Sequence, residues 1–132
     1  MKYFTIAELC KSNTADQLGI DNRCRKEDVV NMTALVDNVL DPLREAYGKP
    51  ITVNSGFRCP TLNRAVKGSA TSDHMTGRAA DITGGSPAEN KKLFYLIQSL
   101  GLPFDQVIDE KNFAWVHVSY REGANRKQVL AL

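Results

Sequence analysis

The chain has 132 residues and a mass of 14.6 kDa, which fits one domain that buries about two-thirds of the surface of its unfolded form. Hydrophobic residues make up 42% and charged residues 24%, values that exclude a disordered or fibrous chain. The net charge of +2 is spread without a basic block, so no nucleic-acid partner is expected. Residues 1–132 are therefore predicted to form a single domain.

The cysteines and the hydropathy pattern indicate where such a chain is made. Cys10, Cys24 and Cys59 are odd in number and form no CxxC pair, so free thiols are expected in place of a disulfide framework or a zinc knuckle. Residues 1–6 lack the apolar core of a signal peptide, and no apolar run approaches the ~20 residues of a membrane span. We expect cytoplasmic synthesis without a signal peptide, no membrane insertion, and a monomer.

Helical patterns dominate the first part of the chain. A capping box at residues 5–8 begins a short helix, and the polar residues 13–25 are expected to form an irregular arm that wraps the core. Apolar residues recur at steps of three and four over residues 26–47, which predicts the main helix. Pro42 should kink or divide this helix, and Gly48 should end it.

Short β-branched segments and turn residues dominate the rest. Strands are predicted at residues 51–54, 79–83, 104–110, 115–120 and 128–132, with helices at residues 60–66 and from Pro87 to Leu100. The order of these elements predicts an α+β fold, in which helices pack against a small antiparallel sheet.

Three residues of the second half predict a metal centre. The chain has only two histidines, His74 and His117, and Asp81 follows His74 by seven residues across a glycine. Zinc binds imidazole nitrogen and carboxylate oxygen, and a catalytic zinc keeps three protein ligands plus a water whose pKa falls towards ~7. We therefore predict that His74, Asp81 and His117 hold one zinc ion with one position open.

Hydrolysis also needs a carboxylate that takes the proton of the water and delivers it to the leaving amine. If residues 111–114 form a four-residue loop, paired positions sum to 225 and Ile108 lies opposite His117. Glu110 then shares a face with His117, which makes it the first candidate for the general base. A three-residue loop would bring Asp109 to that face instead, because a register shift of one exchanges the faces.

Other polar residues are candidates for substrate binding. Arg58 can grip the oxyanion of a tetrahedral intermediate or a substrate carboxylate through two parallel hydrogen bonds. Ser72 and Gln106 can add hydrogen bonds to a peptide. Gln106 is included because it is four residues before Glu110 on the same strand, so both side chains point to the same face. Each residue also has a structural alternative: Arg58 in a surface ion pair, Ser72 as a cap of the loop, and His117 as an ordinary strand histidine.

The motif Ser72-x-His74-x-x-Gly77-x-Ala79-x-Asp81 matches the SxHxxGxAxD signature of the D-Ala-D-Ala carboxypeptidase and dipeptidase family of zinc peptidases. The family also contains phage endolysins. Residues 55–58 (SGFR) and 115–117 (WVH) resemble the flanking elements of the same family, and the likeness extends back to residues 4–9. The chain most resembles the compact branch found in phages and prophages.

This resemblance implies a Hedgehog/DD-peptidase type of α+β fold, a zinc ion on the three ligands named above, and hydrolysis of peptide bonds in peptidoglycan stems. Arg58 matches an arginine that assists substrate or transition-state binding. Better-known members have an acidic residue three positions before the last histidine, where this chain has Ala114. Glu110 instead resembles the glutamate that precedes the WVH element in the compact branch.

The leading hypothesis is a zinc peptidase of cell-wall stem peptides, either a D-Ala-D-Ala carboxypeptidase or an endopeptidase cutting L-Ala-D-Glu or a cross-link. The alternatives are a non-catalytic zinc-bearing module that binds wall peptides or a protein partner, and a cytoplasmic structural protein without metal. An enzyme of this kind would reach the wall through a phage lysis system or as part of a virion.

Overall fold

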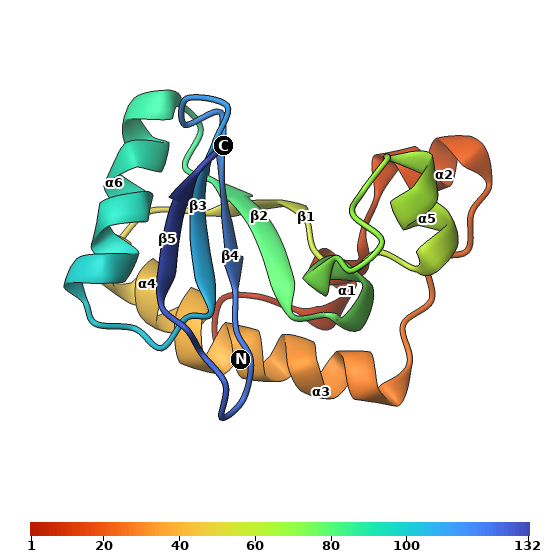
Figure 1. The fold of residues 1–132 in the computed structure, drawn as a ribbon, viewed down its shortest axis with the longest axis horizontal. Helices are drawn as coiled ribbons and strands as arrows, with labels where there is room; N and C mark the ends of the chain where they lie inside the picture. Colours follow the sequence, from red (N-terminus) through yellow and green to blue (C-terminus); the bar gives the residue numbers. More distant parts are fainter.

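The structure, a computed structural model that describes residues 1–132, is built on a five-stranded sheet (Figure 1). The spatial order is β1-β2-β4-β3-β5, and every neighbouring pair is antiparallel except β3 and β5, which run parallel. The predicted α+β class is confirmed, with a sheet that is mixed at one edge. The strands are β1 (Thr52–Ser55), β2 (Ala79–Thr83), β3 (Gln106–Glu110), β4 (Trp115–Ser119) and β5 (Gln128–Ala131).

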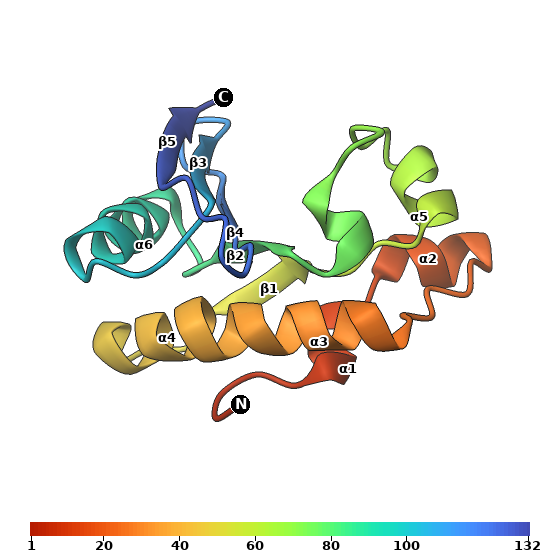
Figure 2. The same ribbon diagram turned by 60° about the horizontal axis from the view of Figure 1, so that its bottom comes forward.

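Helices cover one face of this sheet and surround one end of it. Figure 2 shows α3, η1 and α4 as one continuous rod beneath the strands. Helix α6 packs against α4, β3 and β4. No helix is both long and apolar enough to cross a bilayer. The helical elements are α1 (Ile6–Cys10), α2 (Asn13–Leu18), α3 (Lys26–Leu35), η1 (Val36–Leu40), α4 (Asp41–Tyr47), α5 (Pro60–Ala65), η2 (Asp73–Thr76) and α6 (Pro87–Ser99).

The rod confirms the helix predicted over residues 26–47 and shows how Pro42 is accommodated. The segment η1, just before the proline, has π-helical hydrogen bonding, in which the Asp41 N–H donates to the Val36 carbonyl five residues earlier. A π turn widens the helix where the proline lacks a donor and would crowd the preceding turn. Gly48 then ends the rod with a φ of 74°.

The prediction of an irregular arm over residues 13–25 is wrong for its first half, which forms α2. The Ser12 hydroxyl accepts the N–H of Ala15 at the start, and Gly19 with a φ of 67° closes the end. A six-residue helix is too short to display a helical hydrophobic period, so its caps are the only sequence signal.

Successive side chains along the strands alternate between two faces of the sheet, one facing the hydrophobic core and the other carrying the polar site. Side chains of β2 and β4 that point towards the helices are fully buried in a core of 20 residues. Their neighbours Asp81 and His117 point to the opposite face, because successive strand residues alternate. The core-facing residues are Ala80, Ile82, Val116 and Val118.

The predicted register of the β3–β4 hairpin is confirmed. Ile108 lies opposite His117 and Glu110 opposite Trp115, as the four-residue loop requires. Three consecutive loop residues, Lys111, Asn112 and Phe113, have positive φ angles between 52° and 62°. The Phe113 N–H donates to the Asp109 carboxylate at 2.6 Å, which holds the loop closed from the core side.

Candidate metal centre

The three predicted ligands meet on the open face of the sheet. One donor atom of each of His74, Asp81 and His117 lies within 4.8 Å of the others. Asp81 and His117 are direct partners across β2 and β4, and the Asp81 Oδ1 atom is 3.0 Å from His117 Nδ1. The same oxygen is 3.3 Å from His74 Nε2. Two ligands therefore come from adjacent strands and the third from η2.

The His74 ring is fixed so that one nitrogen faces the other ligands. Its Nδ1 atom is 2.7 Å from the Gly56 carbonyl oxygen, which can only accept, so Nδ1 carries the proton. Nε2 is then a lone-pair acceptor, and it is buried without a hydrogen-bond partner. Metal-bound histidines in proteins are commonly oriented through their other nitrogen in this way.

The donor set fits one Zn²⁺ ion. Without a cation, the lone pair of His74 Nε2 faces a carboxylate oxygen of Asp81, and neither atom supplies a proton. A buried acceptor left unsatisfied costs about 1–3 kcal/mol, and a cation between the two acceptors removes that cost. Two imidazoles and one carboxylate form a set that binds zinc and leaves a coordination position for a water or substrate.

The electrostatics of Asp81 also suit a cation. Burial raises the pKa of this carboxyl, but interactions with His117 and His74 outweigh burial and hold the pKa well below its ordinary value. Asp81 is therefore ionised at neutral pH, as a metal ligand must be.

Arg58 lies beside the three ligands. Its backbone N–H donates to the His74 carbonyl at 3.0 Å, which ties the segment after β1 to η2. The Nε atom of its guanidinium is buried without a partner, and this burial lowers the pKa of Arg58 against the attraction of Asp81. No ion pair neutralises Arg58, in contrast to the structural alternative of a surface salt bridge. Its role in substrate binding stays a prediction.

Glu110 lies on the face of the sheet that carries His117. Both line a hollow of about 380 Å³, here called the Glu110 hollow, together with Gln106 and Ser72. Asp109 pairs with the core residue Val116, and its carboxylate accepts from the loop backbone. The structure thus places Glu110, and not Asp109, beside the metal ligands; its role as general base stays a prediction.

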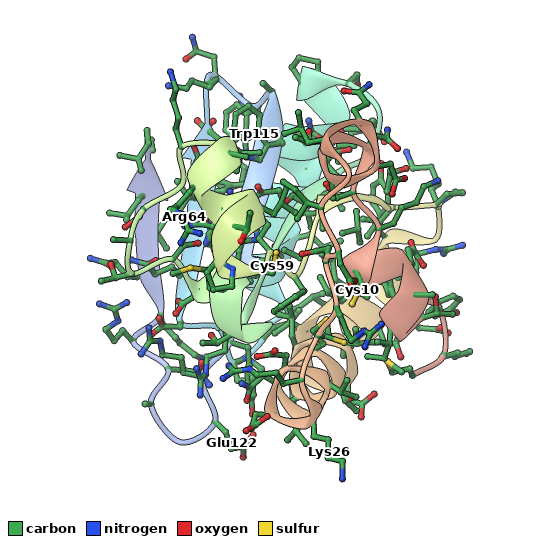
Figure 3. The ribbon with its side chains drawn as sticks, turned by 90° about the vertical axis from the view of Figure 1, so that its right-hand side faces the viewer. Cys10, Lys26, Cys59, Arg64, Trp115 and Glu122 are labelled. Carbon is green, nitrogen blue, oxygen red and sulfur yellow. The ribbon has the colours of Figure 1, made fainter.

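The other two predicted substrate ligands already have partners. The Ser72 hydroxyl accepts the N–H of His74 at 3.1 Å and caps η2, which is its structural alternative. The Gln106 side chain donates to Gln128 on β5 at 2.7 Å, although it still borders the Glu110 hollow. Cys59 is a free thiol, as expected; it is half-buried and caps α5, where Figure 3 labels it.

Comparison with known proteins identifies the family. A family model described as Peptidase M15 matches residues 2–119. The chain belongs to the peptidase M15 family. The zinc D-Ala-D-Ala carboxypeptidase of Streptomyces albus G is 42% identical over 86 residues, which cover 63% of this chain and 32% of that protein. The chain thus spans about a third of the length of this curated relative, and the resemblance inferred from the signature at residues 72–81 is confirmed.

Gly56 supports the metal centre of this M15 chain, although the sequence analysis did not assign it to the site. Its carbonyl orients His74, and a Cβ at this position would lie 2.2 Å from the carbonyl oxygen of Leu9. Any side chain would therefore push the segment away from α1 and move that carbonyl. The sequence feature that could have indicated this role is the glycine of the SGFR element at residues 55–58.

A second hollow of about 360 Å³, here called the Arg58 hollow, also borders the M15 site. Asp81 lines it from β2, Arg58 from the segment after β1, and residues 11–14 from the junction of α1 and α2, where the arm begins. The arm predicted only to wrap the core thus borders the site. Asp81 lines this hollow and His117 lines the Glu110 hollow, so each of the two hollows borders one member of the ligand triad.

Proposed function

We propose that this chain is a zinc-dependent peptidase that hydrolyses a peptide bond in the stem peptides of bacterial peptidoglycan. The observation that carries the proposal is the buried, unpartnered Nε2 atom of His74, which faces Asp81 and His117 with Glu110 and Arg58 alongside. Membership of the M15 family and the D-Ala-D-Ala substrate in the name of the curated relative support the choice of substrate.

His74, Asp81 and His117 would hold the zinc ion. Zinc in such a site acts as a Lewis acid that polarises a carbonyl and makes water a better nucleophile at neutral pH. The protein fixes the donors before zinc binds, through the strand pairing of Asp81 with His117 and the Gly56 carbonyl that orients His74. Preorganised donors keep their geometry during reaction, which stabilises developing charge at no reorganisation cost.

Glu110 would move the proton. Its carboxylate takes a proton from the attacking water and delivers it to the nitrogen of the leaving amine, so the peptide C–N bond breaks and an acid and an amine are released. The position of Glu110 on the same face as His117, at the wall of a hollow, supports this role.

Arg58 would bind developing or permanent negative charge. A guanidinium with a buried, unpartnered N–H has donors free for the oxyanion of the tetrahedral intermediate or for a substrate carboxylate. The two hollows give room for peptide on both sides of the scissile bond, so both a carboxypeptidase and an endopeptidase reaction are compatible with the site.

The test is mass spectrometry of products from zinc-loaded protein incubated with defined peptidoglycan and with synthetic stem peptides. Loss of terminal D-Ala indicates a carboxypeptidase, and fragments cut between L-Ala and D-Glu or at a cross-link indicate an endopeptidase. A chelator should suppress either product. Peptide binding without cleavage at full zinc occupancy would contradict the enzyme and favour the non-catalytic binding module.

We also propose that the active form is a monomer that acts at the bacterial cell wall. All five residues assigned to zinc, proton transfer and charge binding come from one chain, so the site needs no second copy. Light scattering coupled to size-exclusion chromatography tests this, because a dimer at the concentration of the activity assay would contradict it.

A further inference from the structure

His74 differs from the other two ligands in how it is held. Asp81 and His117 are on paired strands, whereas His74 belongs to η2, a single 3₁₀ turn of four residues. Sites on strands are more rigid than sites on loops and single turns. The turn that carries His74 therefore needs ties to the rest of the structure.

The first residue of η2, Asp73, supplies such a tie. Its side chain is only 11% exposed, and its Oδ1 atom lies 2.5 Å from Nη2 of Arg121, 48 residues away in the chain. Arg121 is the second residue of the connection from β4 to β5, in which Figure 3 labels Glu122. The ion pair thus links the turn that carries His74 to the end of the strand that carries His117.

Arg121 is itself held from the opposite side. Asp105, which precedes β3, is fully buried, and its carboxylate lies 3.5 Å from Nε of Arg121. The same carboxylate accepts two hydrogen bonds from the Arg126 guanidinium, at 2.9 Å each, and one from the Arg126 N–H at 3.1 Å. Arg121 is therefore fixed between Asp73 and an anchored carboxylate, and this pairing restricts its rotamers.

We infer that Arg121 is a positioning residue for the metal centre, because it holds Asp73 and so fixes the turn that presents His74. The inference rests on the proposed zinc site. It adds a charged contact on the neighbouring residue to the hydrogen bonds of His74 itself, which involve the Gly56 carbonyl, the Ser72 hydroxyl and the Arg58 N–H. Asp73 and Arg121 also line the Glu110 hollow, so a shift of η2 would change the wall of that hollow.

The opposite charges of Asp73 and Arg121 strengthen the contact that holds η2. Charge-assisted pairs of arginine and carboxylate are stronger than neutral hydrogen bonds. Asp73 is mostly buried, whereas Arg121 is partly exposed, so removal of Arg121 takes the charged partner from the more buried group of the pair. Without Arg121, the Asp73 carboxylate loses its charged partner and is free to move, and because Asp73 is the first residue of η2, this freedom loosens the turn that presents His74.

The test compares Arg121→Gln with Arg126→Gln, which removes contacts to Asp105 but leaves the pair of Arg121 and Asp73. Zinc affinity is measured by competition with a chelator, and Co²⁺ replaces Zn²⁺ to give a visible absorption spectrum that reports ligand geometry. Arg121→Gln should weaken zinc binding about tenfold, the low end of effects for residues that support metal ligands, and alter the Co²⁺ spectrum. Arg126→Gln loosens the anchor of Asp105 but keeps the pair of Arg121 and Asp73, so it should lower the melting temperature and weaken zinc binding less than Arg121→Gln does. Arg121→Lys should restore part of the affinity.

Equal zinc affinity and identical Co²⁺ spectra in wild type and Arg121→Gln would overturn the inference. If Arg121→Gln does not fold, the isosteric Asp73→Asn variant carries the same test with a smaller expected effect. Failure of the proposed function is distinguishable: a wild-type protein that binds zinc but cleaves nothing leaves the positioning experiment intact. A wild-type protein that binds neither zinc nor cobalt overturns the metal centre itself.

Discussion

Glu110 and Asp109 are neighbours in sequence but lie on opposite faces of the sheet. Strand geometry alone separates them, since successive side chains point in opposite directions. Asp109 is opposite the buried Val116 and is engaged by the loop backbone, whereas Glu110 borders the hollow that contains His117. This difference gives a direct test of which carboxylate performs proton transfer.

Glu110→Gln should lower kcat by about 10²-fold or more, because it removes the proton acceptor but keeps the shape of the side chain. Zinc content and melting temperature should stay near those of wild type. The measurement is steady-state hydrolysis of a stem peptide by protein with one zinc per chain, confirmed by elemental analysis.

Asp109→Asn is the matched control for that experiment. It weakens the acceptor of the Phe113 N–H, so it should reduce stability by about 1 kcal/mol and leave kcat within a few-fold of wild type. The reverse outcome, in which Asp109→Asn abolishes hydrolysis and Glu110→Gln does not, would show that the assignment of the base is wrong.

Gly56→Ala should lower both stability and zinc affinity. The added Cβ would lie 2.2 Å from the Leu9 carbonyl oxygen, and the required backbone shift costs about 1–3 kcal/mol and displaces the carbonyl that orients His74. Gly101→Ala is the control, because its new Cβ would have no atom within 4 Å, so it strains only a backbone with a φ of 67° and should lower stability without changing zinc affinity. Chemical denaturation and chelator competition measure the two effects, and unchanged zinc affinity in Gly56→Ala would count against the orienting role.

Among the elements, α6 is attached to the rest of the molecule by a cluster of charges at its first turn. Glu89 accepts from Tyr47 at 2.5 Å and pairs with Lys49 and with Lys92. Tyr47 ends α4, and Lys49 lies in the turn that leads to β1, so Glu89 connects three elements. Ser86 caps the same helix by accepting the Glu89 N–H at 3.2 Å.

The pH dependence of stability should reflect this cluster. Lys49, Lys92 and Tyr47 lower the pKa of Glu89 from 4.5 to about 2. Because the folded pKa is depressed, the contribution of Glu89 is fully present above its unfolded pKa and is lost as the pH falls towards about 2. The melting temperature of wild type should therefore exceed that of Glu89→Gln at neutral pH, and the difference should shrink between about pH 5 and pH 2.

Differential scanning calorimetry at several pH values measures this difference. A gap between the two proteins that stays constant down to about pH 2 would show that the Glu89 charge does not contribute, and that the variant acts through packing alone.

At the scale of the whole molecule, the hydrophobic core and the metal centre occupy opposite faces of one sheet. The core of 20 buried residues lies between the sheet and the helices and does not include any of the three zinc ligands. The fold should therefore persist without metal, in contrast to small zinc modules that unfold when the metal is removed.

Zinc removal should consequently lower the melting temperature without abolishing the cooperative transition. A ligand that binds only the folded state adds RT ln(1 + [L]/Kd), about 2.7 kcal/mol at a hundredfold excess over Kd. Thermal unfolding of apo and zinc-loaded protein tests this, with His117→Ala as a control in which the zinc-dependent shift should be lost. Complete unfolding of the apo protein would contradict the separation of core and site.

Most of the fold followed from local patterns. The periodicity of residues 26–47 was sufficient to predict the long helix. Prolines and glycines marked the ends of helices and strands, and the four-residue loop at 111–114 predicted the hairpin register. These patterns failed for α2, whose six residues are too few to show a period, and for the parallel pairing of β5. The return of the β4–β5 connection to the start of β3 depends on long-range contacts, among them the Lys127 N–H to the Phe104 carbonyl.

The sequence by itself predicted the metal donor set, because only two histidines exist and the signature at residues 72–81 contains one of them with Asp81, and the structure brings these three side chains together. The alternation of side chains along the strand also made Glu110 a better candidate than Asp109 for the general base. Only the tertiary structure decided how these groups are held: the Gly56 carbonyl on His74 and the Arg121 guanidinium on Asp73 join residues 18 and 48 positions apart. Such contacts follow from how the chain packs, and no local period encodes them.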